Sequence, residues 1–412
     1  MSNRTIYFAI PAVNEKEFLP FTLDCIGKQR CEADVNIKVY VCVNQPESWW
    51  EEERVNICEN NQATIELLKN YSHLDIHLID KSSRGNGWET KKQGVGCARK
   101  LLMDTILTTA SDNDILISMD ADTTFDADYC QSVLNNFRWH KTAVAIAVPY
   151  YHRLTRSEPE DRAMLRYEIY ARNYNLNLLR IGSPYAYTAL GSAIACTVRA
   201  CRAVGGFDTQ PSGEDFYFLQ KLCKYGHVLR YNKKQVYPAT RYSARVPFGT
   251  GAAMQKGSAG NWKNYPIFDY RTFDIIEKTY EQIPVLFYQH FDNDFTDFLR
   301  NYFSTKDLWD TLRKNYKSLS TFTRAFHSNV DGLKIFQFLR QFQSHVRKSD
   351  EDCLSDFIEQ HYPQEHAHFF SKEKKFSFST TPVPQINKLR NFFIKQETVY
   401  QQEWDDKIRE AR

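Results

Sequence analysis

One short stretch, Ile115-Leu116-Ile117-Ser118-Met119-Asp120-Ala121-Asp122, joins an apolar run to two carboxylates. The β-branched bias of the run predicts a buried strand that leads into Asp120 and Asp122. Two residues apart on an extended backbone, these two side chains point the same way. Open α/β sheets bind ligands at the carboxyl ends of their strands, and paired carboxylates hold hard cations such as Mg²⁺ or Mn²⁺. An acidic turn after a strand is the alternative, because Asp is a common turn residue.

Strands and helices alternate on both sides of this stretch. The run 5–10 predicts a first strand that stops at Pro11, and further strands are expected at 37–43, 76–79 and 143–148. An amphipathic pattern predicts one long helix over 46–69, and another helix is expected at 98–107. This alternation predicts an α/β fold with a doubly wound, mostly parallel sheet and helices on both of its faces.

The composition limits the classes of function. Lys plus Arg number 53 and Asp plus Glu number 50, so the net charge of +3 gives no reason to expect a nucleic-acid partner. The ten cysteines form no CxxC pair, which favours small buried side chains in a reducing compartment. Neither a signal peptide nor an apolar run of about 18 residues is found. We therefore expect a cytoplasmic protein without a transmembrane segment; peripheral membrane contact and oligomeric state stay open.

The segment 268–412 differs from the rest of the chain. Gly332 is its only glycine, and aromatic residues are frequent. Apolar residues recur there at helical spacing and predict a core-facing stripe. The stripe consists of Val330, Leu333, Phe336, Leu339 and Phe342. We expect a mostly helical C-terminal region.

Four motifs occur in a fixed order along residues 4–250. They are Pro11-x-x-Asn14-Glu15, Ala98-Arg99, Asp120-x-Asp122, and Gly205-Gly206-Phe207-Asp208 followed by Glu214-Asp215. Each motif is short, but together and in this order they resemble the family 2 glycosyltransferases, which have the GT-A fold. The resemblance implies a glycosyltransferase domain over 1–267, with a nucleotide-sugar half at about 1–125 and an acceptor half at about 126–267.

The resemblance also implies the donor side of the site. It assigns the metal ion, Mn²⁺ or Mg²⁺, to Asp122 and Asp120, with Asp120 nearer the ribose. It assigns the nucleotide sugar to Pro11, Asn14, Glu15, Asn44, Arg84, Lys92, Arg99, Asp120, Ala121 and Asp122. The family often has an acid where Asn44 stands, and an asparagine can still hydrogen-bond a base or ribose. For the basic residues at 84–92 a solvated loop is the alternative.

Asp215 is the expected general base. It would take the proton of an acceptor hydroxyl as that oxygen attacks the sugar opposite the diphosphate, which inverts the anomeric centre. The alternative for Ser212-Gly213-Glu214-Asp215 is a helix capping box. The acceptor or diphosphate side would include Gly191, Ser192, Glu214, Arg241 and Arg245; for the two arginines a solvated strand edge is the alternative.

The implied function is transfer of a hexosyl or related sugar from a nucleotide-diphosphate donor to an acceptor hydroxyl. Polysaccharide or glycoconjugate synthesis at the cell surface is the expected setting. A Gln-x-x-Arg-Trp motif is absent, which argues against a chain-extruding synthase. Two other interpretations remain: a sugar-phosphate nucleotidylyltransferase, and a degenerate, non-catalytic binding module of the same fold. The sequence specifies neither the nucleotide, the sugar, the acceptor nor the linkage.

Overall fold

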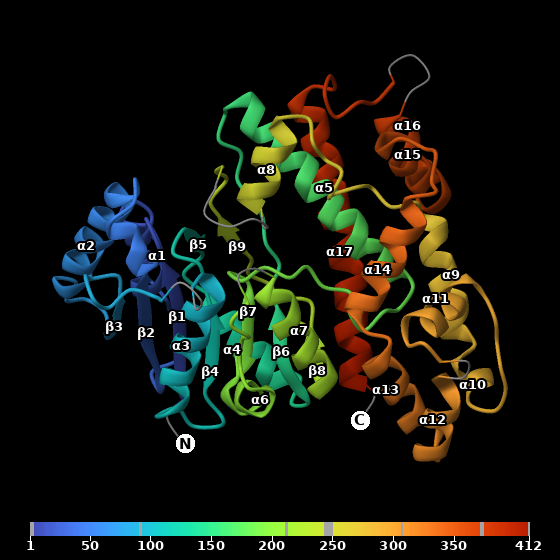
Figure 1. Cartoon of the computed structure of the whole chain (residues 1–412), viewed down its shortest axis with the longest axis horizontal. Coiled ribbons are helices and arrows are strands. Elements are labelled where there is room, and N and C mark those ends of the chain that lie inside the picture. Colours follow the sequence, from blue (N-terminus) through green and yellow to red (C-terminus); the bar gives the residue numbers. More distant parts are fainter. Residues whose placement is uncertain are drawn as a thin grey trace. The chain divides into compact units, whose positions relative to one another are not determined.

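The computed structural model describes residues 4–89, 93–210, 213–242, 250–305, 308–370 and 375–410. The chain divides into two compact units (Figure 1). The sheet unit comprises 1–160, 189–255 and 401–412, and the helical unit comprises 161–188 and 256–400.

A seven-stranded sheet forms the centre of the sheet unit, in the order β3-β2-β1-β4-β7-β6-β8. Every neighbouring pair is parallel except those that include β7, which runs antiparallel to β4 and β6. The mostly parallel α/β sheet expected from the sequence is confirmed. Its strands are β1 (Arg4–Ala12), β2 (Val35–Asn44), β3 (Ile76–Lys81), β4 (Ile115–Ser118), β6 (Ala143–Ala147), β7 (Ile194–Thr197) and β8 (His227–Leu229).

The central strands are apolar because helices cover them. All four residues of β4 are buried, as are the last seven of β1. A sheet buried on both faces selects such continuous apolar runs. The helices of this unit are α1 (Leu19–Gly27), α2 (Val55–Lys69), α3 (Val95–Leu107), α4 (Tyr129–Trp139), α6 (Val198–Val204) and α7 (Glu214–Tyr225).

The ends of several strands meet at one edge of this sheet. Because β1, β2 and β4 are parallel, their carboxyl ends share that edge. The antiparallel strand β7 begins there, since Ser118 at the end of β4 pairs with Ile194. A second, two-stranded sheet lies next in the chain: β5 (Thr123–Phe125) pairs with β9 (Val236–Pro238). The backbone N–H of Ala239 then donates to the Asp122 carbonyl at 3.1 Å, which brings residues 239–241 beside Asp122.

Two expected strand ends were wrong. Strand β1 does not stop at Pro11 but continues to Ala12, and Pro11 pairs with Cys42. Strand β4 ends at Ser118, so Asp120 and Asp122 lie in a turn rather than on an extended backbone. In that turn the Thr123 N–H donates to the Asp120 carbonyl at 3.3 Å. The two carboxylates therefore need not point the same way.

The helix expected over 46–69 is interrupted. A 3₁₀ turn, Glu47–Trp50, comes first, and α2 begins only at Val55. The Glu47 carboxylate accepts the N–H groups of Gly85 and Gly87, each at 2.8 Å, and the Trp50 indole donates to the Ser82 carbonyl at 3.1 Å. These contacts with a distant loop fix the segment in a conformation that helical periodicity alone does not predict.

Helices make up the helical unit, as expected for the C-terminal region. They are α9 (Tyr270–Glu281), α10 (Ile283–Leu286), α11 (Asp294–Tyr302), α12 (Leu308–Asn315), α13 (Leu319–Asn329), α14 (Gly332–Gln343), α15 (Asp350–His361) and α16 (Pro363–Phe369). Most of α5 (Glu158–Arg180) and of α17 (Val383–Glu410) also belongs to this unit, and α8 (Thr250–Ser258) ends in it.

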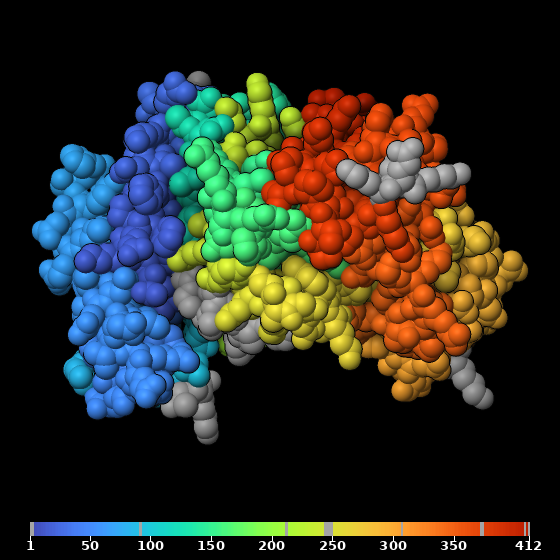
Figure 2. Space-filling model, turned by 90° about the horizontal axis from the view of Figure 1, so that it is seen from above, coloured from blue at the N-terminus to red at the C-terminus, as the bar shows by residue number. Residues whose placement is uncertain are grey.

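A buried ion network joins α5 to α17. Arg172 pairs with Glu168 at 3.1 Å and with Glu397 at 2.6 Å. Arg390 lies 3.6 Å from Glu168, and both of these side chains are fully buried. Figure 2 shows α5 in green next to the red C-terminal segment. Such a network stabilises only when every charge has a partner, so it fixes how these two helices pack.

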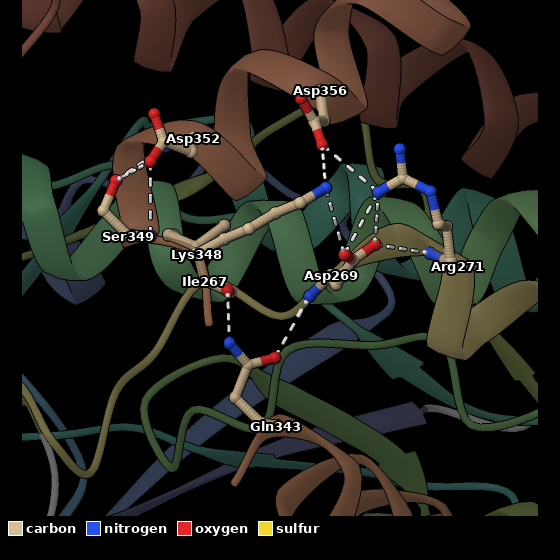
Figure 3. A network of polar contacts seen from close by, with 8 residues as sticks. All are labelled: Ile267, Asp269, Arg271, Gln343, Lys348, Ser349, Asp352 and Asp356. Atoms are coloured by element: carbon tan, nitrogen blue, oxygen red, sulfur yellow. Dashed lines mark hydrogen bonds and ion pairs between the residues drawn. The ribbon is translucent and has the colours of Figure 1, made fainter. Parts of the chain in front are cut away.

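A second polar network fixes the start of α9 (Figure 3). Asp269 caps this helix by accepting the N–H of Arg271 at 3.0 Å. Asp356 of α15 accepts from both Arg271, at 3.2 Å, and Lys348, at 2.5 Å. Gln343 accepts the Asp269 N–H at 3.2 Å and donates to the Ile267 carbonyl at 3.3 Å. Helices α9, α14 and α15 are thereby joined at one end.

No helix in the described part of the chain is long and apolar enough to cross a membrane. All ten cysteines are free thiols.

Candidate active site

Arg99 of α3 lies at the centre of the motifs that the sequence singles out. Its Nη1 donates to the Ser118 hydroxyl at 2.5 Å and to the Gly191 carbonyl at 2.6 Å. Its Nη2 meets Asp120 at 2.6 Å, and its Nε pairs with Glu214 at 3.1 Å. Only 4% of Arg99 is exposed. Arg99 therefore connects four parts of the chain: strand β4, the acidic turn, helix α7, and the loop before β7.

The Gly205–Asp208 motif contacts both Arg99 and helix α7. The Phe207 ring is buried, lies 5.4 Å from the Arg99 guanidinium and packs against Phe218 of α7. Asp208 pairs with Lys221 of α7 at 3.0 Å. The motif thus holds α7 beside Arg99, which is a structural role that its sequence did not reveal.

Asp215 stands in the first turn of α7, next to Glu214. The Asp215 side chain is half-buried, and its carboxylate accepts the Phe216 N–H at 2.8 Å. Burial and the neighbouring Glu214 carboxylate raise the pKa of Asp215 to about 7, although Arg99 acts in the opposite direction. A carboxyl group with such a pKa can both accept and release a proton at neutral pH.

The capping box expected as an alternative role for this segment is not seen at Gly213. Gly213 is the N-cap of α7 and has no side chain to accept a hydrogen bond. Ser212, the residue proposed to cap, lies outside the described residues.

Asp122 faces a different partner from Asp120. Arg241, three residues after β9, donates from its Nη2 to Asp122 Oδ2 at 2.6 Å and to Glu15 Oε1 at 2.5 Å. Arg241 Nε also donates to Asp122 Oδ2, at 2.9 Å, and the guanidinium lies 4.3 Å from the Phe18 ring centre. The carbonyl of Ala121, between the two acids, accepts the Thr22 hydroxyl at 2.9 Å and anchors the turn on α1.

Hydrogen bonds hold Asn14, just after β1, and Asn44, the last residue of β2. Asn14 has φ 58°, a left-handed conformation that Asn tolerates, and its N–H donates to the Asn61 side chain at 2.8 Å. Asn44 donates to the Ala12 carbonyl at 3.1 Å and accepts the Trp88 indole N–H at 3.2 Å. Asn44 and Glu15 are both buried, so this edge of the site is ordered before any ligand binds.

The remaining predicted residues fall into three sets: two beside β4, one at the surface, and two outside the described residues. Gly191 and Ser192 lie beside the end of β4, where the Ser118 hydroxyl donates to the Gly191 carbonyl at 2.7 Å, and Ser192 is buried. Arg84 is exposed; it pairs with Glu51 at 2.8 Å and lies over the Trp50 ring. Lys92 and Arg245 lie outside the described residues.

Three further residues belong to this site and were not predicted. Ser118 accepts from Arg99, Asn61 fixes the Asn14 backbone, and Trp88 holds Asn44. Ser118 was detectable as a polar residue in an apolar strand. Asn61 was detectable as a polar residue on the buried face of α2. Trp88, in a glycine-containing loop, gave no signal of its partner.

The carboxylates are of the type that a divalent metal prefers. Among the described residues no group of three or more His, Cys, Asp or Glu side chains could hold a metal ion. Two carboxylate oxygens, from Glu15 and Asp122, nevertheless converge on one cationic nitrogen, Arg241 Nη2. That convergence fits a cation between Glu15 and Asp122. Asp120 instead pairs with Arg99.

Residues 115–300 match the model of "Glycosyl transferase family group 2". This part of the chain is therefore similar to the family 2 glycosyltransferases. The match begins at β4 and includes the acidic turn, the Gly205–Asp208 motif and Asp215, so it covers the residues around Arg99. The enzyme class expected from the four motifs is confirmed. No curated protein matches the chain.

Solved structures similar to this chain include S. aureus TarS 1–349 in complex with UDP-GlcNAc, at 11% identity and a TM-score of 0.39, over 98% of this chain and 92% of that one. Another is the mannosyltransferase PcManGT from Pyrobaculum calidifontis in complex with GDP-Man and Mn²⁺. It is 15% identical, with a TM-score of 0.38, over 97% of this chain and 87% of that one.

Proposed function

We propose that this glycosyltransferase moves a sugar from a nucleotide-diphosphate donor to an acceptor hydroxyl, with inversion and with the help of a divalent metal, Mn²⁺ or Mg²⁺. Synthesis of a cell-surface polysaccharide or glycoconjugate is the proposed setting. All of the described residues that we assign to the reaction lie in the sheet unit and within residues 1–267. We place the reaction in the cytoplasm, since ten free cysteines fit a reducing compartment.

The main support for this proposal is the raised pKa of Asp215. Its half-buried carboxyl group has a pKa of about 7, so a large fraction is ionised at neutral pH while its basicity stays high. We assign it the proton of the acceptor hydroxyl. The acceptor oxygen forms a bond to the anomeric carbon, the bond from that carbon to the diphosphate breaks on the opposite face, and the proton moves to Asp215.

The donor half is assigned to the edge formed by β1, β2 and the acidic turn. Pro11, Asn14 and Asn44 are proposed to face the nucleoside, because the group around Asn44 is ordered and polar. Glu15 and Asp122 are the carboxylates proposed to hold the metal, which as a Lewis acid stabilises charge on the departing diphosphate. Asp120 is proposed to be a nucleotide contact, although its described partner is Arg99. Arg84 and Lys92 are further proposed contacts of the nucleotide.

The acceptor half is assigned to the other side of Arg99. Gly191 and Ser192, just before β7, are proposed to line it, and Glu214 holds Arg99 beside Asp215. Arg241 and Arg245 are proposed diphosphate contacts, since a guanidinium can bind phosphate oxygens with two hydrogen bonds.

Transfer assays with variants test this function. A thermal-shift panel of UDP, GDP, dTDP and CMP with Mn²⁺ first identifies the nucleotide, because a ligand that binds only the folded chain raises its stability. With the matching sugar donor, we expect Asp215→Asn to lower kcat by about 100-fold or more, the usual scale for loss of a general base, with little change in nucleotide affinity.

Asp122→Ala should weaken both donor binding and transfer. Asp112→Asn, which removes an exposed carboxyl paired with Arg202, should leave both unchanged. Full transfer activity in Asp215→Asn would contradict the assignment of the base.

A further inference from the structure

We propose that Arg241 is an internal cation that takes the place of a divalent metal between Glu15 and Asp122, and that the metal binds when Arg241 withdraws. This inference rests on the proposed metal dependence of the transferase. It adds an exchange, at Glu15 and Asp122, between a side chain and a metal ion.

The geometry of Arg241 is the first observation. One nitrogen, Nη2, lies 2.5 Å from Glu15 Oε1 and 2.6 Å from Asp122 Oδ2. These two acids belong to distant parts of the sequence, one after β1 and the other after β4. Their oxygens meet at the guanidinium and, among the described residues, no third acid completes a ready-made metal cluster there.

Burial is the second observation. Of their side chains, Glu15 exposes 5%, Asp122 15% and Arg241 21%. Two carboxylates so poorly solvated and so close repel each other unless a cation lies between them. The site therefore favours a positive charge, which the guanidinium supplies here and which a metal ion can supply in its place.

The attachment of Arg241 permits the exchange. The backbone is held before it, where Ala239 donates to the Asp122 carbonyl at 3.1 Å and the Thr240 hydroxyl donates to the Arg153 carbonyl at 2.6 Å. The guanidinium itself sits at the end of a long side chain and can leave by rotation about its own bonds. Once released, it can form two hydrogen bonds to a phosphate group, so metal binding would free Arg241 for the diphosphate.

Calorimetry with Mn²⁺ alone, on the full chain without donor or acceptor, tests the exchange. In Arg241→Gln the metal no longer competes with a guanidinium, and we expect Mn²⁺ to bind about tenfold more tightly than to the wild-type chain. Arg241→Lys keeps a charge but loses the additional contact that Arg241 Nε makes with Asp122, so its affinity for Mn²⁺ should fall between the two. Adding Glu15→Gln or Asp122→Asn to Arg241→Gln should abolish the gain.

The matched control is Arg138→Gln. Arg138 of α4 also pairs with a carboxylate, that of Glu32, through both of its terminal nitrogens, but outside this site. It should bind Mn²⁺ like the wild-type chain. Equal, weaker or absent Mn²⁺ binding in Arg241→Gln overturns the proposal, as does a gain that survives Glu15→Gln. If Arg241→Gln does not fold, as judged by circular dichroism, Arg241→Lys is the test instead. Mn²⁺ binding to Arg241→Lys that is no tighter than to the wild-type chain then overturns the proposal.

The Mn²⁺ calorimetry and the sugar-transfer assay test the two proposals separately. A chain that shows the expected Mn²⁺ pattern but transfers no sugar contradicts the proposed function and leaves the exchange standing. A chain that transfers sugar while Arg241→Gln binds Mn²⁺ no more tightly contradicts only the exchange.

Discussion

Asp215 shows how one residue obtains its chemistry from its surroundings. Its pKa rises from 3.8 to about 7 chiefly because burial disfavours the charged form, and the adjacent Glu214 adds to the effect. We therefore predict that kcat/KM for transfer rises with pH and levels off above an apparent pKa of about 7. A pH profile of the wild-type chain measures this, and in Asp215→Asn the rise should disappear together with most of the activity. A profile that is flat from pH 5 to 8 in the wild-type chain would contradict the assignment.

The same shift has a consequence for stability. The folded chain holds the Asp215 proton more tightly than the unfolded chain does, so its contribution to stability is complete below the ordinary pKa of 3.8 and is lost as pH rises through about 7. The proposed general base thus lowers the stability of the folded chain at the pH where it is ionised. Asp215→Asn should be relatively more stable than the wild-type chain at pH 8 than at pH 5, as thermal unfolding at the two values can show.

At the scale of elements, Arg99 connects α3 with β4, α7 and the loop before β7. Gly191 permits this, because a Cβ there would lie only 2.0 Å from Arg99 Nη2. We predict that Gly191→Ala displaces the guanidinium and lowers kcat by about 10- to 100-fold, since small misplacements of catalytic groups have effects of that size. Steady-state kinetics measures the loss.

Gly27→Ala is the matched control. A methyl group at Gly27 would meet only Leu74 Cδ2, at 3.9 Å, so kcat should stay at the wild-type value. Combining Gly191→Ala with Arg99→Lys tests the contact itself: the two losses should be less than additive because both act through one guanidinium. Additive losses would show that Gly191 acts independently of Arg99.

Features formed by neighbouring residues could be predicted from the sequence, whereas contacts between distant segments could not. The mostly parallel sheet was predictable because buried strands such as β4 are continuous apolar runs. Glu214 and Asp215 were predictable as part of a motif that opens a helix. The pairing of Arg241 with Glu15 was not, since the two lie 226 residues apart and the β5–β9 pairing, which brings the segment of Arg241 to the acidic turn, has no signal in either motif.

The apolar stripe expected over 330–342 did not match the buried face of α14 at every position. The expected stripe in α14 took every third residue from Val330 to Phe342, but steps of three residues drift around a helix of about 3.6 residues per turn. The buried positions of this helix include Ile335, Phe338 and Leu339, whereas Phe336 is only half-buried. The helix was thus correctly predicted, and its buried face only in part, since Leu339 of the expected stripe is buried.

At the scale of the whole molecule, the chain returns at its end to the unit in which it began. Residues 401–412 belong to the sheet unit, although most of α17 belongs to the helical unit. Asp405 of this last segment is buried and accepts the backbone N–H groups of Arg230, at 3.1 Å, and Tyr231, at 2.9 Å, just beyond β8. The Arg230 guanidinium lies 3.6 Å from the Trp404 ring centre. The C-terminal segment therefore holds the chain just beyond β8, the outermost strand at one side of the sheet.

We predict that Asp405→Ala loosens this edge, because two buried N–H groups lose their acceptor at a cost of about 1–3 kcal/mol. Hydrogen exchange at Arg230 and Tyr231 should accelerate by about 10- to 100-fold. Asp406→Ala is the control: Asp406 is exposed and pairs with Arg409, so exchange at the two amides should not change.

Burial raises the pKa of Asp405 to about 7, which gives this prediction a pH dependence. The folded chain again binds the proton more tightly, so the stability linked to it is complete at low pH and is lost as pH rises through about 7. In Asp405→Asn, whose amide oxygen still accepts a hydrogen bond but cannot titrate, protection of the Tyr231 amide should vary less between pH 5 and 8 than in the wild-type chain. An equal pH dependence in both chains would assign the effect to another group and leave Asp405 as an acceptor alone.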